Sequence, residues 1–341
     1  MKVAVVILNY NGLKFLRQFL QRIVDNCTEN GQVIIADNAS TDGSLEWLRE
    51  NYKSLRLIQF SSNKGFAEGY NEALRQIDAK YFVILNSDIE VTDGWLAPLI
   101  NYMDSNIDVA ACQPKILSYA NKDSFEYAGA AGGFIDAFGF PFCRGRIFTT
   151  LEKDNGQYDD VKDVFWVTGA CMIIRTEIFF EAGGFESFFF AHMEEIDLCW
   201  RIHMMKHRIV SLPYSKVYHI GGGTLDKNSS LKAFLNYRNN LSMLAKNLPV
   251  YLLVPVFLFR IVSDAIAAIV FLFYSGINHF AAVPKAYFSF IYHLPQIARE
   301  RKTFRRKYSN GLPASVYRKP VLIDYFVFRK TKFFSLQKRF S

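Results

Sequence analysis

Short apolar runs alternate with segments of helical character along the first third of the chain. The apolar, β-rich runs predict strands at residues 2–8, 33–36, 55–60, 81–85 and 109–112. Helices are predicted between them, at residues 13–24, 45–51, 67–77 and 95–103. Because short connections between such units force parallel pairing and right-handed crossovers, the pattern predicts an α/β fold with a doubly wound, mostly parallel sheet.

The run at residues 81–85 is apolar throughout, which is typical of a central parallel strand buried on both faces. It stops at three small polar residues, Asn86-Ser87-Asp88. Ligands of open α/β sheets bind beyond the carboxyl ends of the strands, so Asp88 is placed where it could bind a divalent cation that itself holds a phosphate. The alternative is that Asp88 caps the following helix or shapes a turn.

Polar clusters follow the other predicted strands at the same edge. They are Asn9-Tyr10-Asn11-Gly12, the run from Asp37 to Ser44, and Asn63-Lys64-Gly65. The ring of Tyr10 could stack on a base whose imide N–H is accepted by Asp37, although Asp37 and Ser40 also suit an Asx turn and a helix cap. The first strand is followed by neither a dinucleotide fingerprint nor a P-loop.

Residues 118–163 are rich in glycine and aromatic side chains and show no clear periodicity. They predict a long loop or small subdomain over the site, or else an ordinary insertion. Order returns at residues 164–175, predicted as a strand interrupted at Gly169, where a bulge or a close backbone approach is expected.

Glu194 and Glu195 follow an apolar stretch at residues 188–191. An apolar wall raises the pKa of a carboxylate and makes it a usable general base. Asp197 and Arg201 are spaced to pair along a helix. His219 ends a strand predicted at residues 216–218; a lone histidine is more often structural, but Asp88 would need a second cation ligand.

Residues 250–273 are apolar except for Arg260, Ser263 and Asp264, and they contain Pro255. That length suits a membrane span, but the Arg260–Asp264 spacing and the proline favour two helices, here and at 281–294, that lie in the membrane surface. Behind them, residues 296–341 hold 13 Lys and Arg against 2 Asp and Glu, which suits an anionic surface. The alternative is that these helices pack on the rest of the chain or on a second subunit.

Composition adds two expectations. Half of the 341 residues are hydrophobic and 32 are Phe, more than is usual for a soluble enzyme. The five cysteines show no paired spacing, so we expect neither disulfides nor a zinc site. No signal peptide precedes the first strand, so we expect the protein in a reducing cytosolic compartment.

Seven motifs, in this order along residues 2–247, together resemble the family 2 glycosyltransferases of the GT-A fold, within them the bacterial rhamnosyltransferase-like branch of surface-polysaccharide enzymes. The motifs are Ile7-Leu-Asn-Tyr-Asn-Gly12, Asp37-Asn-Ala-Ser-Thr-Asp-Gly-Ser44, Asn63-Lys-Gly-Phe-Ala67 with Asn71, Leu85-Asn-Ser-Asp88, Thr168-Gly-Ala-Cys-Met172, Glu194-Glu-Ile-Asp-Leu198 and His219-Ile-Gly-Gly-Gly-Thr224.

The resemblance implies an inverting transfer from a nucleotide-sugar donor with a divalent cation, Mg²⁺ or Mn²⁺. Asp88 and His219 match metal or diphosphate contacts, and Glu194-Glu195 match an acidic pair whose second member is the usual general base. The donor-binding residues implied by matching motifs are Asn9, Tyr10, Asn11, Asp37, Asn63, Gly65, Asn71, Asn86 and Ser87. Two residues depart from the family pattern: Asn86 replaces an acidic residue, and Glu195 replaces an Asp.

We therefore predict a glycosyltransferase domain at residues 1–247 and a helical, basic, membrane-associating extension at 248–341. The expected donor is UDP- or dTDP-linked, and the acceptor is a glycan or a lipid-linked glycan at the cytoplasmic face of the inner membrane. A homodimer is possible, and no nucleic-acid partner is expected. The alternatives are a nucleotidyltransferase, which would want a basic Gly-rich loop after the first strand, and an inactive nucleotide-sugar-binding scaffold.

Overall fold

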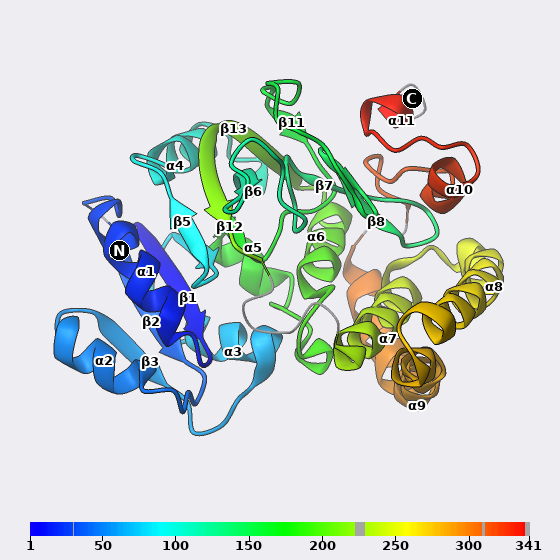
Figure 1. The fold of residues 1–341 in the computed structure, drawn as a ribbon, viewed down its shortest axis with the longest axis horizontal. Coiled ribbons are helices and arrows are strands. Elements are labelled where there is room, and N and C mark those ends of the chain that lie inside the picture. Colours follow the sequence, from blue (N-terminus) through cyan, green and yellow to red (C-terminus); the bar gives the residue numbers. More distant parts are fainter. Residues whose placement is uncertain (30, 222–228, 309–310, 338–341) are drawn as a thin grey trace.

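The computed structural model describes residues 1–29, 31–221, 229–308 and 311–337 (Figure 1). Its main sheet has the strand order β11-β13-β6-β12-β4-β1-β2-β3. The strands are β1 (Val3–Asn9), β2 (Gly31–Asp37), β3 (Arg56–Gln59), β4 (Tyr81–Leu85), β6 (Val109–Ser118), β11 (Lys162–Asp163), β12 (Cys171–Arg175) and β13 (Arg208–His219), with β5 (Ile89–Val91) paired to β13.

Strands β3, β2, β1 and β4 are mutually parallel, as are β6 and β13. Strand β12 lies antiparallel between β4 and β6. The predicted mostly parallel α/β sheet is confirmed. The strand predicted at residues 164–175 is shorter than expected: only Cys171–Arg175 joins the sheet, and the part before Gly169 contributes an isolated bridge between Trp166 and Gly133.

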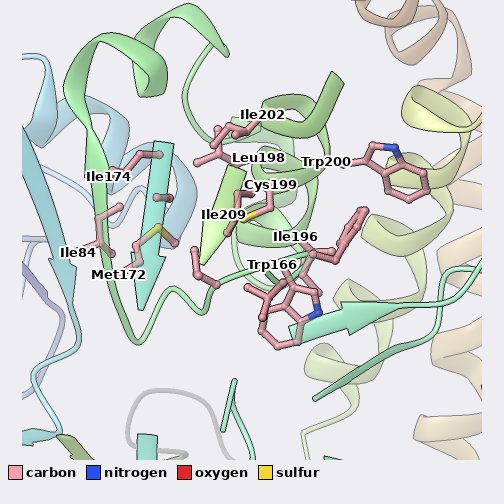
Figure 2. Close-up of a cluster of buried hydrophobic side chains, with 14 of the residues drawn as sticks. Ile84, Trp166, Met172, Ile174, Ile196, Leu198, Cys199, Trp200, Ile202 and Ile209 are labelled. Carbon is pink, nitrogen blue, oxygen red and sulfur yellow. The ribbon is translucent and has the colours of Figure 1, made fainter. Parts of the chain in front are cut away.

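Helices cover both faces of the sheet (Figure 1). Helices α1 (Leu13–Asp25), α2 (Ser44–Asn51) and α4 (Leu96–Ser105) pack into one apolar cluster, and α3 (Gly65–Leu74), α5 (Thr176–Glu181) and α6 (Glu194–Met204) into the other. Alternate residues of one strand enter the two clusters: Val83 of β4 lies in the first and Ile84 in the second. Figure 2 shows this second cluster, where Ile84 and Ile174 lie near Leu198 of α6. Burial of both faces explains why β4 is apolar throughout.

Residues 118–163, predicted as a long loop, a small subdomain over the site or an ordinary insertion, contain a small antiparallel sheet whose apolar residues join the second apolar cluster. Its strands are β7 (Gly133–Ile135), β8 (Pro141–Cys143), β9 (Arg146–Ile147) and β10 (Thr150–Leu151). The expected close approach at Gly169 is also present, because a Cβ there would lie 2.9 Å from the ring of Phe66.

The C-terminal part begins with three long helices that lie together in Figure 1: α7 (Ser230–Asn247), α8 (Val250–Tyr274) and α9 (Ile277–Lys307). The second predicted helix is longer than expected, because the basic residues 299–307 continue it rather than following it as a tail. Short helices α10 (Val321–Phe326) and α11 (Phe334–Gln337) complete the described chain.

The two predicted parts of the chain share one apolar core. Val256 of α8 and Tyr317, Val321 and Phe333 are buried in the same cluster as α3 and α6. The Tyr317 N–H donates to the carbonyl of Ile135 in β7 at 2.9 Å. The boundary at residue 247 stays a prediction, and residues beyond it contribute to the fold of residues before it.

Candidate active site

The ends of β1 and β2 are joined by side-chain hydrogen bonds. Asn9 Nδ2 donates to Asp37 Oδ1 at 3.1 Å and to Ser40 Oγ at 3.0 Å. Asp37 Oδ2 accepts from the Ser40 N–H at 3.0 Å, a bond to the backbone three residues on rather than the two residues of an Asx turn. Asp37 is buried, whereas the neighbouring Tyr10 ring is 38% exposed. An exposed ring beside a buried carboxylate fits the predicted base-binding pair.

The next two predicted residues shape the backbone around this pair. Asn11 has a left-handed φ of 52°, and its Oδ1 accepts from the Thr41 N–H at 2.7 Å. Gly12 has no room for a side chain, since a Cβ would lie 2.4 Å from Asn9 Oδ1 and 3.3 Å from Ser87 Oγ. This close approach places Ser87, at the end of β4, beside Asn9 at the end of β1.

Asn38, which our sequence analysis did not single out, holds the third strand end in place. Its Nδ2 donates to Asn63 Oδ1 and to the carbonyl of Gly65, both at 3.0 Å. Its Oδ1 accepts from the Lys64 N–H at 2.8 Å. Asn63 Oδ1 also accepts from the Gly65 N–H at 2.8 Å, which fixes the turn into α3. Asn38 lies within a quoted motif, so only its role was missing from the prediction.

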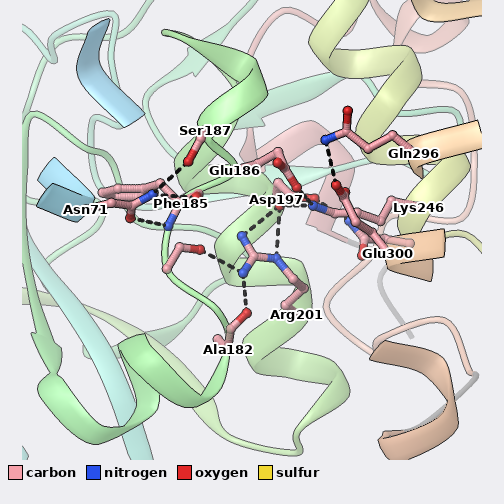
Figure 3. A network of polar contacts seen from close by, with 12 residues as sticks. Asn71, Ala182, Phe185, Glu186, Ser187, Asp197, Arg201, Lys246, Gln296 and Glu300 are labelled. Atoms are coloured by element: carbon pink, nitrogen blue, oxygen red, sulfur yellow. Dashed lines mark hydrogen bonds and ion pairs between the residues drawn. The ribbon is translucent and has the colours of Figure 1, made fainter. Parts of the chain in front are cut away.

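The amide of Asn71 is occupied by protein backbone. Its Nδ2 donates to the carbonyl of Phe185 at 2.8 Å, and its Oδ1 accepts from the Phe185 N–H at 2.9 Å (Figure 3). The residue is 3% exposed. These contacts favour a structural role for Asn71 at the edge of the site. Asn86 is partly exposed, and its N–H donates to the carbonyl of Ala170 at 2.9 Å.

Asp88 and His219 meet as predicted, and a third side chain joins them. Asp88 Oδ1 lies 3.1 Å from His219 Nε2, and His219 Nδ1 lies 3.2 Å from Glu126 Oε2. All three side chains are buried. Glu126 comes from the Gly-rich segment without periodicity, so nothing in its sequence surroundings indicated this position.

The interactions among Asp88, His219 and Glu126 outweigh burial in setting the pKa values of Asp88 and His219. Burial opposes ionisation of Asp88, but its hydrogen bond with His219 holds its pKa below the usual range. Burial likewise disfavours the charged imidazole, yet Asp88 and Glu126 together raise the pKa of His219 to about 10.

These residues fit a divalent cation held jointly with a donor. Asp88 offers a carboxylate oxygen, and His219 would offer Nε2 once a cation displaces the proton that the two carboxylates stabilise on the ring. Glu126 lies 3.2 Å from the other ring nitrogen, as carboxylates often do beside ligating histidines. Within the described residues, no group of three or more His, Cys, Asp or Glu side chains is arranged as a complete metal site. A cation here would take its remaining ligands from phosphate oxygens and water.

Glu194 and Glu195 begin α6. One oxygen of each, Oε2, is buried without a hydrogen-bond partner in the described structure. Burial, reinforced by the neighbouring Glu195, raises the pKa of Glu194 well above its usual value. Burial raises the pKa of Glu195 to about 7. Glu194 is 4% exposed, whereas Glu195 is only half-buried and so is better placed to meet a substrate.

A series of contacts connects the segment before Glu194 and Glu195 to the strand ends. The carbonyl of Phe190, just before α6, accepts from the N–H groups of Phe66 and Ala67 at 2.6 and 3.1 Å. Phe66 packs against Gly169, and Ala170 bonds to Asn86. The structure thus gathers most of the predicted residues at one edge of the sheet. Of the motif that begins at His219, residues 222–224 lie outside the described residues.

Asp197 and Arg201 pair as predicted. Two nitrogens of the Arg201 guanidinium donate to Asp197 Oδ2, at 2.9 and 2.8 Å (Figure 3). Asp197 also accepts from Asn247 and Lys246 of α7. Because these contacts occupy the carboxylate of Asp197, only Glu194 and Glu195 of the three acidic residues in this motif remain candidates for the general base.

This arrangement, a row of polar strand ends with an Asp–His pair and the carboxylates of Glu194 and Glu195, agrees with comparison to known proteins. Residues 4–180 match the model of Glycosyl transferase family 2. The chain belongs to this family, and it is therefore an inverting glycosyltransferase.

The relatives and structural neighbours carry related names. N-acetylglucosaminyl-diphospho-decaprenol L-rhamnosyltransferase of Mycobacterium tuberculosis is 25% identical over 63% of this chain and 75% of its own length. Rhamnosyltransferase WbbL of Escherichia coli is 25% identical over 64% of this chain and 83% of its own.

Two solved structures share the fold. GalNAc-T7 with UDP, GalNAc and Mn²⁺ aligns with a TM-score of 0.53 at 17% identity, over 64% of this chain and 43% of that one. Staphylococcus aureus TarS 1–349 with UDP aligns at 0.51 and 15% identity, over 90% of this chain and 92% of that one.

Proposed function

We propose that this enzyme transfers a sugar from a nucleoside-diphosphate donor to a hydroxyl of a glycan or lipid-linked glycan in cell-surface polysaccharide assembly. The observation that carries the proposal is the pair of buried, unpartnered carboxylate oxygens of Glu194 and Glu195, connected to strand ends shaped for a nucleotide. The names of its bacterial relatives favour a deoxyhexose such as L-rhamnose, linked to dTDP or UDP, and a polyprenyl-diphosphate acceptor.

In this proposal, the Tyr10 ring stacks on the base and Asp37 accepts its imide N–H, while Asn9, Asn11, Asn63 and Gly65 shape the pocket around them. Asn71 acts by holding the backbone at Phe185. Asn86 and Ser87 lie beside the diphosphate, and Asp88 and His219 hold a divalent cation, Mg²⁺ or Mn²⁺. When bound, that cation neutralises the charge that develops on the leaving diphosphate.

Glu195 is the proposed general base. Its carboxylate takes the proton of the acceptor hydroxyl, the hydroxyl oxygen bonds to the anomeric carbon, and the bond from that carbon to the diphosphate oxygen breaks. The nucleoside diphosphate leaves on the opposite face, so the configuration inverts. A pKa of about 7 suits a base that works near neutral pH.

A transfer assay with a panel of UDP-, dTDP- and GDP-linked sugars, with and without Mn²⁺, tests this function. We expect release of nucleoside diphosphate from at least one donor, stimulated by the metal and by a polyprenyl-diphosphate sugar acceptor. Tight donor binding without any release would instead indicate an inactive scaffold.

We further propose that the extension at residues 248–341 rests on the cytoplasmic face of the cell membrane. Within the described residues, α8 alone is long and apolar enough to cross a membrane, and 22% of its most apolar window is buried. Arg260 and Asp264, paired at 3.1 Å, are buried on its inner side, where the hydroxyl of Tyr287 of α9 donates to Asp264 at 2.8 Å. Its opposite side exposes Val254, Leu258, Ile261 and Val262, among others.

A helix whose charged residues contact the protein while its apolar residues face outward suits a position in the membrane surface. Exposed Lys285, Arg299, Lys302 and Arg306 of α9 would add attraction to an anionic leaflet, about 1 kcal/mol for each residue close to it. The same apolar side of α8 would serve a homodimer, which is the competing occupant.

Changing Leu258, Ile261 and Val262 together to Ser should therefore weaken membrane binding without unfolding the protein, because these side chains are 52–62% exposed. The measurement is flotation with anionic phospholipid vesicles at low and high salt. Tyr214→Ser, which removes a side chain that is 70% exposed on β13, is the control and should float like the wild type. If the triple variant floats unchanged, or if the wild type is a soluble dimer that ignores vesicles, the membrane proposal is wrong.

A further inference from the structure

We propose that Asn239 and Arg238 of α7 are positioning residues that hold residues 187–193, here called the strap, in the conformation that presents Glu194 and Glu195 to the substrate. The inference rests on the proposed role of these two carboxylates in transfer. Neither residue of α7 belongs to any motif identified in the sequence analysis.

Asn239 gathers three backbone carbonyls of the strap. Its Nδ2 donates to the carbonyls of Phe189 at 2.9 Å, Ala191 at 2.9 Å and His192 at 2.7 Å. Its Oδ1 accepts from Arg238 Nε at 2.9 Å, which fixes the orientation of the amide. Asn239 is completely buried. One side chain thus supplements the few backbone hydrogen bonds of the strap, which begins as a 3-10 turn at Ser187–Phe189.

Arg238 extends this contact by one residue. Its Nη2 donates to the carbonyls of Phe188 and Phe189 at 2.9 and 3.0 Å, and its guanidinium lies 4.3 Å from the centre of the Phe188 ring. Burial lowers the pKa of Arg238 to about 10, and none of the ion pairs found among the described residues includes it. Burying a charged guanidinium without a carboxylate partner costs free energy. The contacts that offset this cost are the carbonyls of the strap, the amide of Asn239 and the Phe188 ring.

The strap needs such support because its backbone is strained. Phe190, His192 and Met193 have φ values of 64°, 71° and 72°, in the region that side chains other than glycine rarely adopt. Residues in such conformations persist only where their surroundings impose them, and they concentrate at functional sites. Here the surroundings are the donors of Asn239 and Arg238.

The strap connects directly to both halves of the site. The carbonyl of Phe190 accepts from the first N–H groups of α3, and the carbonyl of Met193 accepts from the Asp197 N–H at 2.9 Å as α6 begins. A shift of the strap would therefore move the N-terminus of α6, which carries Glu194 and Glu195. The body of α6 is held separately, by the contacts of Asp197 with Arg201 and Lys246 (Figure 3) and with Asn247. Loss of Asn239 should loosen the strap and leave α6 folded.

The test compares Asn239→Ala with a control on the same helix, Asn240→Ala. Asn240 is also buried, but its Nδ2 donates to the carbonyl of Gly139 at 2.6 Å, away from the strap. We expect Asn239→Ala to lower kcat about 10²-fold, since a base displaced by about 1 Å loses that much. The donor KM should change less than about threefold, because strand-end contacts bind the donor. Asn240→Ala should keep the wild-type kcat.

Two further readouts separate positioning from general destabilisation. Water entering the loosened strap should lower the pKa of Glu195, so the acid limb of the pH–rate profile of Asn239→Ala should move to lower pH. Hydrogen exchange should rise in peptides covering residues 187–196 in Asn239→Ala and not in Asn240→Ala. If Asn239→Ala does not fold, Arg238→Lys, which keeps the charge and loses the paired geometry, should show the same changes to a smaller extent.

Wild-type kcat and an unshifted pH profile in a folded Asn239→Ala variant would overturn the proposal, as would equal exchange in the two alanine variants. A failure of the proposed function can be distinguished from a failure of this inference. If the wild-type enzyme transfers no sugar from any donor, that function is wrong, and the exchange comparison alone then decides whether Asn239 holds the strap.

Discussion

Glu195→Gln is expected to lower the rate of sugar transfer by about 10²-fold or more while leaving donor binding intact, because the amide keeps the shape of the side chain and cannot accept the acceptor's proton. Glu195 is the half-buried member of the acidic pair, and its buried Oε2 has no hydrogen-bond partner in the described structure. The measurement is kcat with the preferred donor, together with the donor dissociation constant by calorimetry.

Glu194→Gln is the matched control for this variant. Glu194 is more deeply buried, and burial together with the neighbouring Glu195 raises its pKa well above the usual value, so we propose Glu195 rather than Glu194 as the base. Replacing Glu194 should cost much less activity. Because burial raises the pKa of Glu195 to about 7, wild-type transfer should fall as the pH drops through about 7, since the base must be ionised. If Glu194→Gln is inactive and Glu195→Gln is nearly normal, the two roles are reversed.

Asp88→Asn is expected to reduce transfer on the order of 10³-fold, because the cation that neutralises the leaving diphosphate contributes several kcal/mol. Asn keeps the size of the buried side chain and an oxygen near His219 Nε2, so the fold should survive. Asp88→Ala should abolish transfer. The measurement is the dependence of rate on Mn²⁺ concentration, with Tyr214→Ser, at an exposed position of β13, as a control that should keep the wild-type metal response.

Full activity of Asp88→Ala in EDTA-treated buffer would show that transfer needs neither a metal nor Asp88. A parallel loss in Tyr214→Ser would mean that the assay reports a general loss of folded enzyme rather than a role of the Asp88 carboxylate.

Much of the fold could be predicted because local pattern and tertiary environment agree. Strand β4 is apolar at every position and proves to be buried on both faces. Strand β12 was harder, because only its last five residues join the sheet and Gly169 packs against Phe66 just before it. The length of α9 was underestimated because its basic final turns resemble a solvated tail, although Arg301 there donates to the carbonyl of Ala245 at the end of α7, at 2.8 Å.

The residues of the candidate site were likewise predictable only in part. Asp37, Asp88 and their neighbours follow strands, so the topology of a parallel sheet predicts where they gather. Glu126 and Asn239 have no such signal: the first comes from an aperiodic segment, and the second is one asparagine of a helix that follows the site in the sequence. Their roles depend on long-range contacts, which spacing along the chain does not reveal.

The anomeric configuration of the product, determined by nuclear magnetic resonance in the transfer assay with the preferred donor, tests the account most directly. A base at Glu195 on the face opposite the leaving diphosphate predicts a single displacement, so the sugar should appear in the acceptor with inverted configuration, in the first turnover and without a glycosylated enzyme. A product with retained configuration would contradict the account.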